Sequence, residues 1–155
     1  HSGDLRTDLT AVADQTWHEL HAHPWLLQAP KSRPWIGPHV SARYEWQLGA
    51  LEGIGLTDLE MDQALAMVLG FTEACARDSV EAARARAAST MSDVEWWERN
   101  APVLATLMSA DDFPVSGRVG QAAGEEYQAA ADPARTYRFG LARIVDGLEV
   151  LLAGR

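Results

Sequence analysis

Two capping boxes constrain the fold of this chain more than any other feature of its sequence. In Thr57-Asp58-Leu59-Glu60 and Ser92-Asp93-Val94-Glu95, the hydroxyl can accept a hydrogen bond from the amide three residues on, and the glutamate reaches back to the first amide. No stretch alternates apolar and polar residues between turn signals, as a half-buried strand would. The sequence therefore predicts an all-α fold.

Other start and stop signals divide the chain further. We predict helices over residues 4–22, 38–54, 58–88 and 133–154, a helix that starts after Ser92, and a short helical turn over 25–29. Pro102 is expected to kink the helix after Ser92 or to end its first part. Prolines and a glycine predict a stiff loop over 30–38, and a proline with several glycines predicts a loop or frayed helix over 111–124.

The last predicted helix has two faces that need to be covered. Its apolar seam consists of Tyr137, Leu141, Ile144, Leu148 and Leu151, and Gly140, Gly147 and Gly154 recur on another face. Glycine inside a helix costs about 1 kcal/mol relative to alanine, so glycines in register indicate that another helix backbone comes close. The 58–88 helix has a matching strip of small side chains. Either ordinary packing within the chain or a symmetric helical dimer would cover these faces.

The charge of the chain restricts its partners. Its 155 residues include 22 acidic and 13 basic side chains, which gives a net charge of −9, whereas a DNA-binding surface needs clustered Lys and Arg. The length and the apolar fraction of 47% are typical of a single globular domain, which we assign to residues 1–155. With Cys75 as the single cysteine, no apolar leader and no long apolar run, we expect a cytoplasmic protein that does not enter a membrane.

Signatures of catalysis and of metal binding are weak. The chain has no Gly-x-Ser-x-Gly elbow, no phosphate-binding loop and no Cys-x2-Cys pair, so we do not expect an enzyme. His18 and His21 share a helix face and His23 follows them, but two ligands on one face do not make a metal site. We therefore expect no metal and no cofactor, and histidines that serve the surface or the end of the helix.

Aromatic and polar residues gather around the proline-rich loop. Trp35 precedes Gly37-Pro38, and Tyr44 and Gln47 are three residues apart on the next predicted helix. Such a set can line a pocket for a flat, mostly apolar molecule with a few hydrogen-bond anchors. The alternative is that the large aromatic side chains simply fill the core.

Three segments together resemble the carboxyl-terminal domain of TetR-type (tetracycline-repressor family) transcriptional regulators. They are His23-Pro24-Trp25-Leu26-Leu27 with Arg33-Pro34 and Gly37-Pro38; Glu45-Trp46-Gln47-Leu48 through Leu51 with Gly55-Leu56-Thr57; and Phe139-Gly140-Leu141 with Ile144, Gly147-Leu148-Glu149 and Leu152. In that family this domain binds an inducer and forms a dimer, and an amino-terminal helix-turn-helix domain binds the operator. The resemblance implies that the helix-turn-helix is missing from this chain, in agreement with its acidic charge.

The resemblance also implies roles for individual residues. Gln47 matches the glutamine that contacts drug in tetracycline-binding members, whereas Ala29 stands where those members have a metal-coordinating histidine, so a magnesium–tetracycline complex is not expected. The expected effector-binding residues are Gln15, His18, Arg33, Trp35, Tyr44, Gln47, Leu65, Val68 and Thr72. The expected dimer interface, a four-helix bundle, includes Ser79, Ala83, Gly140, Arg143, Gly147 and Val150.

These observations lead to two functional hypotheses. The first is the effector-sensing and dimerisation domain of a transcriptional repressor, whose small flat hydrophobic ligand releases the full-length homodimer from operator DNA. The second is a stand-alone protein, either drug-sequestering or enzymatic, that has kept the domain without the DNA-binding head.

Overall fold

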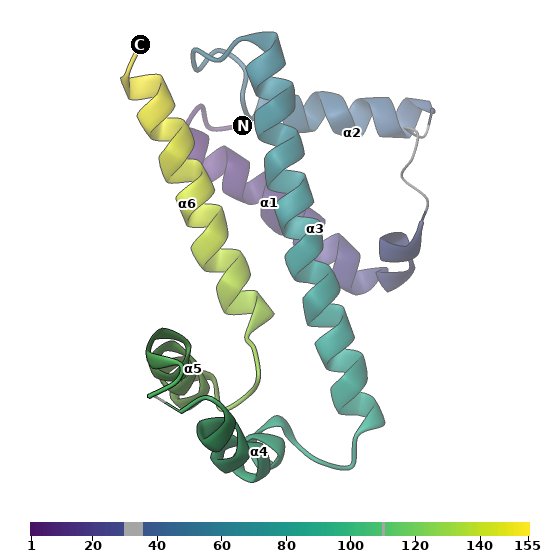
Figure 1. The fold of residues 1–155 in the computed structure, drawn as a ribbon. Coiled ribbons are helices and arrows are strands. Elements are labelled where there is room, and N and C mark those ends of the chain that lie inside the picture. Colours follow the sequence, from purple (N-terminus) through teal and green to yellow (C-terminus); the bar gives the residue numbers. More distant parts are fainter. Residues whose placement is uncertain (30–35, 110) are drawn as a thin grey trace. The chain divides into compact units, whose positions relative to one another are not determined.

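The computed structural model describes residues 1–29, 36–109 and 111–155 (Figure 1). Its elements are α1 (Leu5–Ala22), the 3-10 helix η1 (Pro24–Gln28), α2 (Pro38–Gly49), α3 (Asp58–Ala88), α4 (Asp93–Leu107), α5 (Pro114–Tyr127) and α6 (Pro133–Ala153). No strand occurs in these residues, and the prediction of an all-α fold is confirmed. The predicted stiff loop over 30–38 lies mostly outside the described residues.

The helix starts follow the predicted capping chemistry. The Glu60 carboxylate accepts hydrogen bonds from the Thr57 amide and hydroxyl, both at 2.8 Å. Donation by the Thr57 amide and hydroxyl, together with the nearby Arg155, lowers the pKa of Glu60 to about 2. At α4 the Ser92 hydroxyl accepts from the Glu95 amide at 3.2 Å, which completes the second box. Local sequence therefore sets where α3 and α4 begin.

One predicted boundary is wrong. Helix α2 ends at Gly49, not near residue 54, because the chain turns there and places Gly53 and Gly55 at φ values of 74° and 101°, which glycine adopts without strain. Residues 114–127 form the helix α5, which is the helical one of the two predicted alternatives, a loop or a frayed helix. Pro102 lies inside α4, which continues past it to Leu107.

The described chain divides into two compact units. Residues 1–78 and 134–155 form the core unit, and residues 79–133 form the α4–α5 unit, which also takes the last part of α3. The assignment of residues 1–155 to a single domain stays a prediction.

Helices α1, α3 and α6 supply most of the hydrophobic core of the core unit. Leu9, Val12, Leu65, Val68 and Val145 are almost completely buried there. Helix α6 runs alongside α3 in the opposite direction (Figure 1). Arg155, two residues after the end of α6, pairs with Glu60 in the first turn of α3.

The apolar seam of α6 differs from the predicted one. Its buried residues are Tyr137, Leu141, Val145 and Leu148, with Leu152 packed against the core, whereas Leu151 is 43% exposed. The prediction that Leu151 belongs to the seam is therefore wrong.

Polar contacts between α1 and α6 add to this packing. The Arg6 guanidinium pairs with Asp146 and Glu149, each at 2.6 Å. Near the other end of α6, the buried Tyr137 hydroxyl donates to the Asp14 carboxylate at 2.7 Å. These contacts tie α1 to α6 at two points, Arg6 and Asp14.

The α4–α5 unit depends on a contact between an indole and a glycine. A Cβ added to Gly124 would lie 1.8 Å from Cζ2 of Trp97, so only glycine leaves room for this ring. The glycine that suggested a loop is therefore a packing site inside α5.

No helix in the described ranges is both long enough and apolar enough to cross a membrane.

Candidate functional site

A cavity of about 220 Å³ lies in the core unit, where α1, η1, α2 and α3 meet. Among the described residues, its lining combines three leucines, Leu20, Leu26 and Leu69, with five polar or charged side chains, Thr16, Glu19, Arg43, Gln47 and Glu73. Small-molecule sites likewise combine apolar contact surface with polar groups that orient the ligand.

Gln47 is the buried residue of α2, with only 5% of its surface exposed. Its side-chain amide has no hydrogen bond to any residue within 1–29, 36–109 or 111–155, although the amide offers a carbonyl acceptor and two N–H donors. The residue as a whole is buried, but its amide is not among the fully buried polar atoms that lack a partner, so the amide is open to the cavity and can exchange hydrogen bonds with a ligand there.

Arg43 lies one turn before Gln47 and faces the same cavity. Its guanidinium forms an ion pair with Glu19 of α1 and lies 3.4 Å from the Thr16 hydroxyl, which in turn donates to the Val12 carbonyl at 3.1 Å. Arg43 therefore connects α2 to α1 across the cavity.

A second arginine supports the opposite wall. Arg77 donates to Glu73 at 3.0 Å and to the Leu27 carbonyl at 2.9 Å, which holds η1 against α3. In the described part of the cavity wall, the charged groups are the carboxylates of Glu19 and Glu73 and the guanidinium of Arg43.

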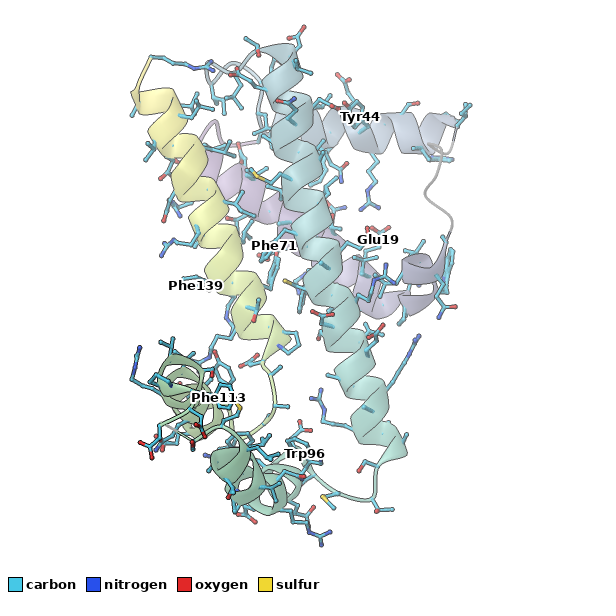
Figure 2. The ribbon with its side chains drawn as sticks, in the orientation of Figure 1. Glu19, Tyr44, Phe71, Trp96, Phe113 and Phe139 are labelled. Carbon is cyan, nitrogen blue, oxygen red and sulfur yellow. The ribbon has the colours of Figure 1, made fainter. Side chains whose placement is uncertain are left out.

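The predicted effector-binding residues lie in different places. Gln47 lines the cavity, but Tyr44 is 43% exposed and its hydroxyl donates to Asp62 at 2.7 Å, next to the start of α3 (Figure 2). Gln15 and His18 are exposed on α1. Their contact with an effector stays a prediction.

Another group of predicted residues belongs to the core. Leu65, Val68 and Thr72 are buried on α3 and do not line the cavity. The Thr72 hydroxyl has no hydrogen-bond partner in the part of the chain that the structure describes. Arg33 and Trp35 lie outside that part.

Sequence reasoning missed Thr16, Glu19, Arg43 and Glu73. A usable signal was the spacing of four between Arg43 and Gln47, which places both on one face of a helix. The pairing of Arg43 with Glu19 has no comparable signal, because it joins two helices through tertiary structure.

The residues predicted for the dimer interface differ in exposure. On α6, Val150 is 73% exposed and Gly147 has no described atom within 4 Å of an added Cβ. Arg143 is exposed and pairs with Asp146 at 2.6 Å. Ser79 is half-buried and Ala83 is exposed, both in the α4–α5 unit.

Gly140 has an intrachain neighbour instead of an open surface. A Cβ added there would lie 2.1 Å from Cζ of Phe71, and Figure 2 shows this ring between α3 and α6. Ordinary packing within the chain, one of the two explanations considered from the sequence, accounts for this glycine. Gly147 keeps the other explanation open.

Metal-binding and nucleophilic chemistry have little support in the described ranges. No group of three His, Cys, Asp or Glu residues there could hold a metal ion. Cys75 is buried, and burial raises the pKa of its thiol, which disfavours the reactive thiolate.

Comparison with known proteins decides the family. The family model described as "Tetracyclin repressor-like, C-terminal domain" matches residues 1–152. The chain belongs to this family. This tetracycline-repressor-like domain is also 33% identical, over 154 residues, to the HTH-type transcriptional repressor DrrR1 of Streptomyces coeruleorubidus, covering 99% of the domain and 54% of the relative. The domain therefore spans about half the length of that relative, and the resemblance predicted from its sequence is confirmed.

Proposed function

We propose that this chain is the effector-sensing and dimerisation domain of a TetR-type transcriptional repressor. A small, flat, mostly apolar effector would bind it and release the full-length homodimer from operator DNA. The match to the C-terminal domain of the family and the relative named as a repressor support this function. DNA contact would belong to an amino-terminal domain outside this sequence, and the role would be cytoplasmic and non-enzymatic.

The effector would bind in the cavity between α1, η1, α2 and α3. The observation that carries this proposal is Gln47, a buried residue whose amide lines the cavity without a hydrogen-bond partner in the described residues. The three leucines would contact the apolar body of the effector, and Gln47 would orient one polar group of it.

The dimer would form through the outer faces of α3 and α6. On α6, Phe139 and Val150 are 66% and 73% exposed, and on α3, Leu59 is 66% exposed and Gly70 has open space beside it. Such exposed apolar residues beside glycines suit close helix–helix packing in a four-helix bundle. Effector binding can change the geometry of this dimer only if the two dimer arrangements differ in affinity for the effector.

The experiment that tests the proposal uses 1-naphthalenemethanol, a flat neutral probe with one hydroxyl, and isothermal titration calorimetry. Gln47→Leu should weaken its binding about tenfold, because the hydroxyl loses its hydrogen bond. Tyr44→Phe is the matched control, since it removes a hydroxyl that contacts Asp62 outside the cavity, and it should leave the affinity unchanged. Equal affinity for wild type and the Gln47 variant would contradict the proposed site, and weaker binding by the Tyr44 variant would favour the site predicted from sequence.

A further inference from the structure

We propose that the effector of this cavity carries a protonated amine, and that Glu19 binds this amine in exchange for Arg43. This inference rests on the proposed function, because it assigns a chemical class to the ligand of the same cavity. It is carried by two features of the described wall, the unpaired oxygen of the Glu19 carboxylate and the unpartnered amide of Gln47, together with the negative charge of the whole chain.

The charge of the whole chain, −9, favours cations over anions around it. In the described part of the cavity wall, Glu73 pairs with Arg77 and Glu19 pairs with Arg43. Of these two carboxylates, Glu19 is the one that offers an oxygen to a ligand.

Glu19 has an oxygen available for a ligand. Its Oε2 pairs with Arg43, whereas its Oε1 has no partner among the described residues. The side chain is 33% exposed, so a ligand entering the cavity can reach it. An ionised carboxylate offers about four acceptor sites, of which one guanidinium contact uses a small part.

The remaining groups fit the rest of such a molecule. An ammonium has three N–H donors, so it can bind Glu19 and also donate to the side-chain carbonyl of Gln47. The apolar body would then contact Leu20, Leu26 and Leu69. A cation buried against leucines alone would lose its hydration without compensation, and the adjacent carboxylate removes this cost.

The size of the cavity explains why Arg43 would be displaced. Pockets for drug-sized ligands measure about 300–1,000 Å³, whereas this cavity measures about 220 Å³, so such a ligand has to widen it. The contacts of Arg43 with Glu19 and Thr16 hold α2 against α1 and oppose this widening. An amine that replaces Arg43 at the Glu19 carboxylate would remove this ion pair as it binds.

The experiment compares three probes that share one naphthalene ring and differ in charge: 1-naphthylmethylamine, 1-naphthalenemethanol and 1-naphthoate. Calorimetry should show the amine binding about tenfold more tightly than the alcohol, and the carboxylate more weakly than the alcohol, because a hydrogen bond to a charged group is stronger than a neutral one. Glu19→Gln should abolish the preference, so that the amine binds no more tightly than the alcohol to the same variant. Glu45→Gln, which removes the same charge from an exposed position of α2, is the matched control and should keep the preference.

A second variant covers the case in which Glu19→Gln disturbs the fold. Arg43→Gln leaves Glu19 without its partner and should therefore strengthen the binding of the amine, the opposite of the first variant. Circular dichroism checks that both variants remain helical.

The outcomes separate this inference from the proposed function. If all three probes bind equally, or if the preference for the amine survives Glu19→Gln, the inference is wrong, while binding of the alcohol that depends on Gln47 still supports the proposed function. If no probe binds at millimolar concentration, the proposed function of this cavity fails and the inference fails with it.

Discussion

The contact between Gly140 and Phe71 gives a sharp prediction about α6. An added Cβ would lie 2.1 Å from Cζ of Phe71 and 2.8 and 2.9 Å from its Cε atoms, so Gly140→Ala has to displace the ring. Overpacking of this kind costs about 1–3 kcal/mol, whereas alanine gains about 1 kcal/mol over glycine inside a helix. We therefore expect the free energy of unfolding to fall by up to about 2 kcal/mol.

Gly147 is the matched control because it lies seven residues further along the same helix. No described atom is within 4 Å of a Cβ added there, so Gly147→Ala should have only the gain in helix propensity, about 1 kcal/mol. The difference between the two variants removes the propensity term and leaves the steric cost of about 1–3 kcal/mol. Urea unfolding followed by circular dichroism at 222 nm measures both, at concentrations where sedimentation shows monomers.

A double-mutant cycle identifies the ring as the cause. Phe71→Leu shortens the side chain that fills the space beside Gly140, so it should make Gly140→Ala less costly and give a coupling energy of about 1 kcal/mol or more. If Gly140→Ala stabilises the chain as much as Gly147→Ala and shows no coupling to Phe71, the packing argument is refuted. Sedimentation at higher concentration gives Gly147→Ala a second readout, since a Cβ on the proposed dimer face should weaken association.

Two further predictions concern single polar contacts. Tyr137→Phe removes the hydroxyl that donates to Asp14 and should lower the free energy of unfolding in urea by about 0.5–1.5 kcal/mol, and an unchanged value would mean that water satisfies Asp14 equally well. Glu60 has a pKa of about 2 in the folded chain against an ordinary value of 4.5, so its stabilising contribution is present above about pH 5 and is lost as the pH falls towards 2. The stability difference between wild type and Glu60→Gln should therefore shrink over that range in urea titrations, and a difference independent of pH would contradict the assigned contacts.

Helix starts could be predicted from the sequence because their chemistry is local. A capping box needs only the side chains and amides within one turn, and Thr57 and Ser92 both form the predicted hydrogen bonds. Helix α5 could not be predicted in this way. The low helix propensity of Gly124 argues against a helix there. The reason for this glycine is the indole of Trp97, which lies on α4 and packs against it, and the local sequence of α5 does not show this contact.

The error in the seam of α6 has a geometric cause. Counting in steps of three and four from Tyr137 allows either Leu151 or Leu152 as the final member, and the two are one residue apart on the helix. An α-helix with 3.6 residues per turn drifts by about 20° per heptad from a strict repeat of seven, so small errors accumulate towards its end. The structure places Leu152 against the core and exposes Leu151.

The candidate site was only partly predictable for a similar reason. Gln47 could be identified because the resemblance rests on a segment that contains it. The ion pair between Arg43 and Glu19 joins α2 to α1, and both residues look like ordinary surface charges in the sequence. Only the packed helices show that these charges line one cavity.

Helix α2 connects the cavity to the first residues of the chain. One of its faces presents Arg43 and Gln47 to the cavity, and the carbonyl of Trp46 is 2.8 Å from Nε2 of His1, with the two rings 5.4 Å apart. Within the described residues, α2 forms an ion pair with α1 through Arg43, which pairs with Glu19. Under the proposed exchange at Glu19, a ligand that displaces Arg43 would remove this ion pair, and a resulting shift of α2 would change the contact between His1 and Trp46.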